Sequence, residues 1–195
     1  MVLLLSTAMG AAGCESTSAP PDSNPGISFT AEGGTRYAAS GIPQGGGPLS
    51  SEFAVAQPDS VGGFSVVSLE VTQSGSKGNL FVLQARPRGT GTFQCTEDGH
   101  TGCHGRYIVG VHGGTTATYD RWFTLVQGVL TITQLGPDRV RGTFTGTFEA
   151  NDDQPGGSFD VQDGEIDVPY VDNEVTSGAV GCLLSLVGIG QGSCP

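Results

Sequence analysis

The sequence predicts an all-β protein, with an antiparallel β-sandwich as the architecture and a closed up-and-down β-barrel of lipocalin type as the alternative. Through residues 128–170, apolar and polar residues alternate with a turn signal at each break, which is typical of consecutive half-buried strands. The 195 residues include 33 glycines and only 14% charged residues, a composition that suits one domain with many tight turns. No segment after residue 26 shows a convincing period of 3.6 residues, so few helices are expected. The number of short strands and an apparent second layer before residue 91 favour the sandwich.

The first 26 residues predict an export signal and a flexible tether rather than a part of the folded domain. Residues 1–13, MVLLLSTAMGAAG, form an uncharged apolar run that matches a signal-peptide core and is too short to span a bilayer. Residues 11–14, AAGC, resemble the lipobox of bacterial lipoproteins, which implies cleavage before Cys14 and a lipid on that cysteine. An ordinary secreted protein cut near the same alanines is the alternative. Residues 14–26 then form a lipidated cysteine with a flexible Ser- and Pro-rich tether, and residues 27–195 a single β domain.

Within that domain, turn residues separate short segments with strand patterns. We expect two strands within residues 26–43, and further strands at residues 52–57, 63–72, 79–85, 91–95, 106–112, 115–126, 129–134, 140–149, 158–161 and 165–171. The last two strands are separated by a predicted tight turn at residues 162–164. Residues 179–189 are apolar enough for a final strand or a short helix.

The stretch at residues 128–170 predicts its own core positions. Alternation places one set of large apolar side chains on the inward face, namely Leu130, Ile132, Phe144, Phe148, Ile166 and Tyr170. Gly142 and Gly146 share a face with Phe144 and Phe148, and a glycine beside a bulky neighbour lets a ring lie flat across the sheet. Thr143, Thr145 and Thr147 take the opposite face, where they form a Thr ladder.

The densest aromatic cluster lies just before that stretch. Tyr119, Trp122 and Phe123 follow a hairpin signalled by two consecutive glycines at residues 113–114. A symmetric two-residue turn there would set Arg106 opposite Arg121, an unfavourable like-charge pair, so a bulge or a longer loop is expected. The three aromatic side chains are expected in the core or at its rim, and the alternative is an aromatic platform that binds sugar.

The cysteines predict two disulfides. Without Cys14, four cysteines remain in a chain that is predicted to be exported, and oxidising compartments pair thiols. Local pairing joins Cys95 with Cys103 and Cys182 with Cys194, although four cysteines allow three connectivities. A zinc site made by Cys95, Cys103 and the histidines at positions 100 and 104 is the competing interpretation. Its four ligands would have to surround one ion within a single short loop.

The acidic residues offer the most specific polar constellation. Nine carboxylates and no Lys or Arg lie between residues 149 and 195. Two predicted turns bring six of these carboxylates close together, namely Asp152, Asp153, Asp160, Asp163, Glu165 and Asp167. Calcium prefers oxygen ligands, so a calcium site is one interpretation of this cluster. The DVQDGEID run lacks the ligand order and the closing Glu of a calcium loop. The alternative is a solvated acidic edge that prevents aggregation between sheets.

Charge and motifs exclude several function classes. The formal net charge is −11, and such an acid excess repels phosphate backbones, so no nucleic-acid partner is expected. The sequence contains no GxSxG, HExxH or phosphate-loop motif and no GxGxxG followed by a helix. A glycosidase needs two carboxylates at a defined separation. The sequence has nineteen acidic residues, and without a fold their separations are unknown, so no such pair can be chosen. No cofactor is therefore expected apart from the calcium alternative.

The order of signal, tether and the LTI…GTFTGTFE…IDVPY meander resembles the uncharacterised β-rich lipoproteins of environmental bacteria. The resemblance implies a β fold and a place in the bacterial cell envelope, at the outer membrane, the cell surface or the periplasm, with the lipid anchor in the membrane. Three functional hypotheses follow: a non-enzymatic domain that binds glycan, envelope polymer or protein; an assembly component that forms multimers through strand edges or the Thr ladder; and a carboxylate-dependent hydrolase. The sequence leaves the oligomeric state open.

Overall fold

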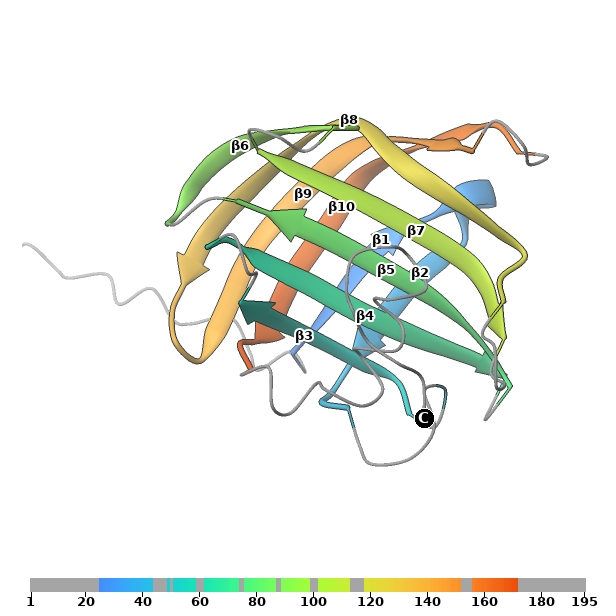
Figure 1. Ribbon diagram of the computed structural model, residues 1–195, viewed down its shortest axis with the longest axis horizontal. Helices are drawn as coiled ribbons and strands as arrows, with labels where there is room; N and C mark the ends of the chain where they lie inside the picture. The colour runs from blue at the N-terminus through green and yellow to red at the C-terminus, as the bar shows by residue number, and fades with distance from the viewer. Residues whose placement is uncertain are drawn as a thin grey trace, which may run out of the picture.

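The computed structural model describes residues 25–43, 49, 51–58, 62–73, 76–86, 89–98, 102–112, 118–151 and 156–171. This part of the chain is all-β, as predicted, with ten strands and one short 3-10 turn, η1 (Glu32–Gly34) (Figure 1). The strands are β1 (Gly26–Thr30), β2 (Arg36–Ser40), β3 (Phe53–Pro58), β4 (Phe64–Gln73), β5 (Lys77–Ala85), β6 (Gly91–Thr96), β7 (Cys103–His112), β8 (Arg121–Leu135), β9 (Arg139–Ala150) and β10 (Ser158–Pro169). The predicted export signal, Cys14 and most of the tether lie outside the described residues.

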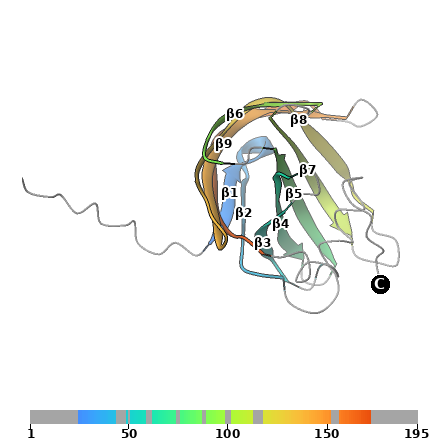
Figure 2. The ribbon, with the colours of Figure 1, turned by 60° about the vertical axis from the view of Figure 1, so that its left-hand side comes forward.

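All ten strands belong to one sheet in the order β2-β1-β10-β9-β8-β6-β7-β5-β4-β3. The sheet is open, with β2 and β3 at its two ends, so the described strands do not form the closed barrel of the alternative prediction. Figure 2 shows the sheet curling over through β6, β8 and β9, so that β1 and β2 face β3, β4 and β5 across the core. The pairings are antiparallel except for β6 with β7, which run parallel where Cys95 pairs with Cys103. The sandwich is therefore made by one folded mixed sheet, not by a purely antiparallel one.

Bulges replace two of the predicted breaks. Separate strands are predicted at residues 115–126 and 129–134, but one strand, β8, begins at Arg121 and continues through residues 127–128 to Leu135, with register shifts between Leu125 and Gln127 and between Ile132 and Gln134. Its first half pairs with β7 and its second half with β6. The predicted turn at residues 162–164 is wrong for the same reason, since β10 continues through it with a shift between Val161 and Gly164. An extra residue bends a strand without ending it, and these bends help the sheet to fold over.

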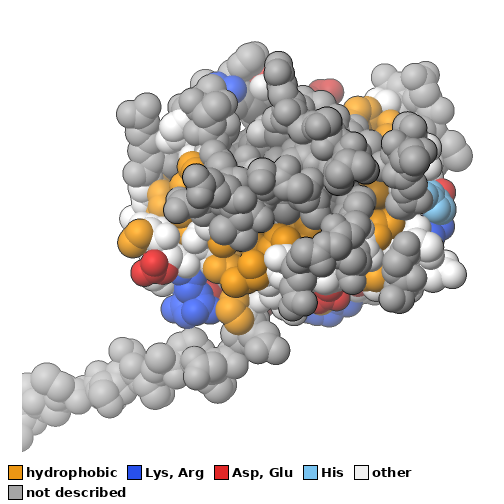
Figure 3. All heavy atoms as spheres, turned by 60° about the horizontal axis from the view of Figure 1, so that its bottom comes forward, with side chains coloured by type: hydrophobic (Ala, Val, Ile, Leu, Met, Phe, Trp, Pro, Cys, Tyr) orange, Lys and Arg blue, Asp and Glu red, His pale blue; other side chains and the backbone are white. Residues whose placement is uncertain are grey.

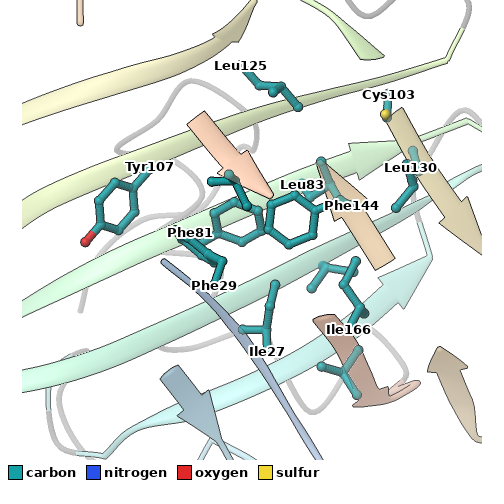
Figure 4. Close-up of a cluster of buried hydrophobic side chains, with 14 of the residues drawn as sticks. Ile27, Phe29, Phe81, Leu83, Cys103, Tyr107, Leu125, Leu130, Phe144 and Ile166 are labelled. Atoms are coloured by element: carbon teal, nitrogen blue, oxygen red, sulfur yellow. The ribbon is translucent and has the colours of Figure 1, made fainter. Parts of the chain in front are cut away.

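The main core fills the space inside the fold with aromatic side chains from both halves of the sheet. Phe29 of β1 lies 4.9 Å from Phe81 of β5, and Phe81 stacks on Phe144 of β9 with ring centroids 5.2 Å apart (Figure 4). A buried hydrogen bond of 2.9 Å also joins the hydroxyls of Tyr37 and Ser68 across the core. The predicted inward positions are confirmed for Leu130, Ile132, Phe144, Phe148 and Ile166, each at most 2% exposed, while Tyr170 is half-buried and packs against them.

The expected partnership between glycine and an aromatic ring exists, on a neighbouring strand. Gly164 of β10 pairs with Phe144 of β9, and a Cβ at Gly164 would lie 2.5 Å from atoms of the Phe144 ring. Glycine at this position therefore lets the ring lie across the sheet.

A second apolar cluster lies on the opposite, outward face of β3, β4, β5 and β7. Its nine members are at most 3% exposed, namely Leu49, Phe53, Val55, Val67, Leu69, Leu80, Val82, Ile108 and Val111. These strands are therefore apolar on both faces, which explains burial patterns such as BBBBBB at the start of β4. Figure 3 shows the molecule from the lower side of Figure 1, where β3 lies, and hydrophobic side chains are visible just below the middle of the view.

Candidate functional site

The three predicted aromatic residues divide between the core and the surface. Phe123 is fully buried in the main core. Trp122 is half-buried and packs against the outward apolar cluster. Tyr119 is 39% exposed and stacks on Trp122, with ring centroids 6.0 Å apart and an angle of 25° between the rings. Phe123 therefore belongs wholly to the core, Trp122 lies at the rim of the outward apolar cluster and Tyr119 lies at the surface.

Contacts with β7 fix the position of the indole in the Tyr119–Trp122 pair. Trp122 pairs with Ile108 of β7, and the guanidinium carbon of Arg106 lies 4.6 Å from the centre of the indole ring. A cation over an aromatic face is an attractive contact that strengthens when water is excluded. Burial lowers the pKa of the Arg106 guanidinium from its usual value. The register of β7 and β8 thus fixes the indole plane on which Tyr119 stacks.

The carboxylate of Asp120 lies between Tyr119 and Trp122 in the sequence and is held by the side chains of Lys77 and His112. Asp120 accepts a hydrogen bond of 2.8 Å from Lys77 Nζ and lies 3.0 Å from His112 Nε2. Lys77 and His112 are direct partners across β5 and β7, which brings both side chains to the same carboxylate. Hydrogen bonds from Lys77 and then from His112 hold the pKa of Asp120 below its usual value. The carboxylate therefore stays ionised at neutral pH with one defined orientation.

Gly110 makes room for that carboxylate. Its φ of +69° is one that favours glycine, and a Cβ there would lie 2.1 Å from Oδ2 of Asp120. The Gly110 amide donates to Oδ1 of Asn79 at 3.2 Å, and Asn79 donates in turn to Glu70 at 2.9 Å. The pairing of β5 with β7 shifts register at this point, so Gly110 lies in a β-bulge. Sequence reasoning missed this network, and an isolated glycine within the β7 pattern was its only signal.

The loop expected between β7 and β8 is confirmed to be longer than two residues. Arg121 pairs with Val109, and Arg106 pairs with Thr124. The next bridge joins His112 to Thr118. The register therefore avoids the like-charge pair of Arg106 with Arg121. Arg121 instead donates to Glu32 at 3.2 Å, near the turn between β1 and β2.

The acidic residues predicted as calcium ligands are spread along β10 and bound to different partners. Asp160 accepts from Thr147 at 2.7 Å, and Asp167 accepts from Arg139 at 2.8 Å. Asp163 accepts from the amide and the hydroxyl of Thr30 at 2.9 and 2.8 Å and contacts Arg36 at 3.2 Å. Its carboxylate thereby extends the pairing of β1 with β10 past the bulge in β10.

Glu165 is exposed and lines a shallow groove with Asp167 and Glu52, whereas Asp152 and Asp153 lie outside the described residues. Among the residues that the structure describes, no three His, Cys, Asp or Glu side chains form a group that fits a metal ion.

The cysteines form one of the two predicted bonds within the described residues. Cys95 at the end of β6 and Cys103 at the start of β7 are joined by a disulfide, with Cα atoms 4.3 Å apart. Both side chains are buried in the main core. The zinc interpretation loses its two thiolates, because a disulfide leaves none. Cys182, Cys194 and the histidine at position 100 lie outside the described residues.

The Thr ladder of β9 lies on the outward face of the other half of the sheet, as predicted. Thr143 and Thr145 are exposed, and Thr131 of β8 bonds with Thr92 of β6 at 3.2 Å. A shallow groove crosses this face, and its lining includes Gln94, Gln127, Thr145, Thr147, Asp160 and Gln162. The face is polar and contains no aromatic residue in the groove lining.

Comparison of the chain with protein-family models, with curated proteins and with solved structures finds no match. No helix in the described ranges is both long and apolar enough to cross a membrane.

Proposed function

We propose that this chain is a non-enzymatic binding domain that holds a neutral glycan against the Tyr119–Trp122 pair. The observation that carries the proposal is an exposed tyrosine stacked on a fixed indole, with the oriented carboxylate of Asp120 next to it in the chain. The C–H face of a sugar ring packs on an aromatic ring, and its hydroxyls bond to carboxylate oxygens and to N–H donors. Tyr119 and Ile42 are the large hydrophobic side chains that are exposed among the described residues.

The rigidity of the site supports binding rather than chemistry. Lys77 and His112 both bond to the carboxylate of Asp120, which orients these side chains before a ligand arrives. Pre-ordered groups lose little conformational entropy when they bind, which favours affinity. The pKa of Asp120 is depressed, whereas a general acid at neutral pH needs a raised one. The third hypothesis, a hydrolase, therefore gains no support at this site.

The test is binding of neutral oligosaccharides to the full chain, followed by the emission of its single tryptophan, Trp122. We expect one class of oligosaccharide to change the emission and Tyr119→Ala to weaken its binding about tenfold, equivalent to ~1.4 kcal/mol. Tyr119→Phe should retain the affinity, because the ring is kept. Ile42→Ala, which removes the other exposed large side chain, is the matched control. Equal weakening by Ile42→Ala, or no binding of any neutral oligosaccharide, would refute the proposal.

The assembly hypothesis has weaker support, because both ends of the sheet are short and partly covered. β2 has five residues and β3 has six, and β3 ends at Pro58. The amide of Ser40 on β2 donates to Glu52, and the carbonyl of Ala56 on β3 accepts from the amide of Val171. Short, covered edges are how proteins avoid strand-to-strand association. The exposed Thr ladder is the remaining surface through which the assembly hypothesis could operate. Multimers that form with rising protein concentration and are dissociated by Thr145→Lys would support that hypothesis.

The envelope location is proposed on the sequence alone. A lipid on Cys14 and a tether of about twelve residues would hold the domain outside the cytoplasm, where a disulfide such as Cys95–Cys103 persists. Intact mass of the protein extracted from membranes measures cleavage, acylation and free thiols together. A mass without an acyl group would refute the anchor and leave the secreted alternative.

A further inference from the structure

The outward apolar face of β3, β4, β5 and β7 needs a covering layer. Paired residues form two apolar rows across these strands, one from Phe53 through Leu69 and Leu80 to Ile108, and one from Val55 through Val67 to Val82. Every described strand belongs to the same sheet, so no described strand supplies a layer over this face. The partly buried hydrophobic residues packed against the cluster are Val71, Trp122 and Val171. A contiguous apolar surface of this kind is rarely left open to water.

The chain passes the edge of this face where the described part ends. The amide of Val171 donates to the carbonyl of Ala56 on β3 at 2.8 Å, and the Val171 side chain packs against the apolar cluster. The 24 residues that follow, 172–195, therefore start at the open side of β3. A covalently attached segment that starts beside a surface has a high effective concentration there.

The composition of the chain outside the described ranges leaves few candidates for the cover. The internal gaps are short and rich in Gly, Ser, Pro and Asp, and residues 15–24 are polar. Two apolar stretches remain, residues 2–12, which belong to the predicted export signal, and residues 179–189, AVGCLLSLVGI. The second stretch carries no charge and is flanked by polar residues on both sides. It is also the stretch that follows Val171, the residue at the edge of the face, in the chain.

The lengths agree as well. Four neighbouring strands span about 14 Å, since strands lie ~4.8 Å apart. Eleven residues cover about 16 Å as a helix and about 36 Å when extended. Either conformation is therefore long enough to cross β3, β4, β5 and β7.

We propose that residues 172–195 dock on the outward face of β3, β4, β5 and β7, with residues 179–189 covering the apolar cluster. The segment serves as a third layer of the domain and brings its end toward Trp122, the indole beside that cluster. The proposal does not depend on glycan binding. It rests on the apolar rows of this face and on the position of Val171 at its edge.

The first test uses Trp122 as a reporter in the full chain without any ligand. Trp122 is the only tryptophan and packs against the proposed contact. We replace four apolar residues of the segment by serine in one variant, namely Leu183, Leu184, Leu186 and Val187. The expected result is emission at longer wavelength and a severalfold rise in acrylamide quenching, with the far-UV spectrum of the sheet retained. The control variant carries serine at four positions before the apolar stretch, namely Asn173, Glu174, Thr176 and Gly178.

Unchanged emission and quenching in the apolar variant, with the sheet intact, would overturn the proposal. If that variant does not fold, the second test decides. In a chain with Cys182 and Cys194 replaced by serine, Leu186→Cys is combined with Val67→Cys on the face, or with Thr145→Cys on the far face of the sheet. We expect an intramolecular disulfide with position 67 and none with position 145. Cross-linked dimers through position 67 would show that a second copy occupies the face, and equal or absent linkage would also contradict docking.

Discussion

Replacing Gly164 by alanine should destabilise the fold, whereas the same replacement at Gly157 should not. A Cβ at Gly164 would lie 2.5 Å from two atoms of the Phe144 ring and 2.5 Å from the Phe144 carbonyl oxygen. The ring is 1% exposed and packed against Phe29 and Phe81, so it has little space to move. At Gly157, which immediately precedes the same strand, a Cβ would meet no atom within 4 Å. Neither glycine has a positive φ, so alanine is allowed in both conformations.

Two opposing contributions decide the sign. Alanine restricts the unfolded chain and stabilises a protein by about 0.4–1 kcal/mol where the native conformation accepts it. Overpacking a filled core costs about 1–3 kcal/mol. Because one of the atoms that Gly164→Ala would press on is backbone, we take the upper end, which leaves a net loss of about 2 kcal/mol. Gly157→Ala keeps only the first contribution and should be neutral or slightly stabilising.

Thermal unfolding followed by circular dichroism measures the difference. A loss of ~2 kcal/mol corresponds to a Tm lower by about 4–8 °C in a domain of this size. Adding Phe144→Leu should recover part of the loss, with a coupling of about 1 kcal/mol. Recovery remains partial because the Phe144 carbonyl oxygen is still in place. A Tm for Gly164→Ala at or above that of Gly157→Ala would refute the packing of Phe144 across β10.

Three further predictions concern contacts between strands. Tyr37→Phe leaves the buried hydroxyl of Ser68 without its tyrosine partner and should cost about 1–3 kcal/mol in denaturant unfolding, and adding Ser68→Ala should recover most of it. For Asp167, burial raises the pKa, but the hydrogen bonds from Arg139 and Arg141 outweigh it and the net pKa is lowered. Its stabilisation should therefore be present above about pH 4 and vanish as the pH falls through the lowered pKa. The Tm difference between the wild type and Asp167→Asn, measured from pH 7 to pH 2, should shrink in the acid range, and a constant difference would contradict the ion pair. Reducing the Cys95–Cys103 disulfide, or replacing both cysteines by serine, should cost about 2.5 kcal/mol, the value for so short a loop, and an unchanged Tm would argue against that bond.

The strands of this fold were predictable because a half-buried strand carries its own signal. Alternation from Val140 to Phe148 defines two faces, and the structure buries the predicted one. The same local rule fails at the bulges. Gln162, Asp163 and Gly164 have the composition of a turn, yet they continue β10 because Gly164 gives space to Phe144 and Asp163 bonds with Thr30 on β1. Turn and bulge use the same residue types, and only the neighbouring strands decide between them.

The candidate site was predictable only in its aromatic part. Tyr119 and Trp122 are close in sequence, so a cluster could be expected. The partners of Asp120 come from two other positions, and Lys77 is 43 residues away. Which cation meets this carboxylate depends on the register of β5 with β7, and that register shifts at the bulge where Gly110 lies. Long-range register is set by the whole sheet rather than by local spacing.

Trp122 contacts both surfaces for which we propose a role, the Tyr119–Trp122 pair and the outward apolar face of β3, β4, β5 and β7. It continues the cross-strand row that runs from Phe53 through Leu69, Leu80 and Ile108, and its ring also supports Tyr119. A layer that shields the row also restricts the indole, because the two share one rigid sheet. Removing Tyr119 disturbs only the exposed side of the pair, whereas removing the apolar residues of the C-terminal segment disturbs only the shielded side. Both sets of variants are expected to expose more of the indole, because each removes one of its neighbours. Glycan binding therefore separates the proposals: if Tyr119→Ala weakens it and the serine variant of the C-terminal segment retains it, each surface has its own occupant.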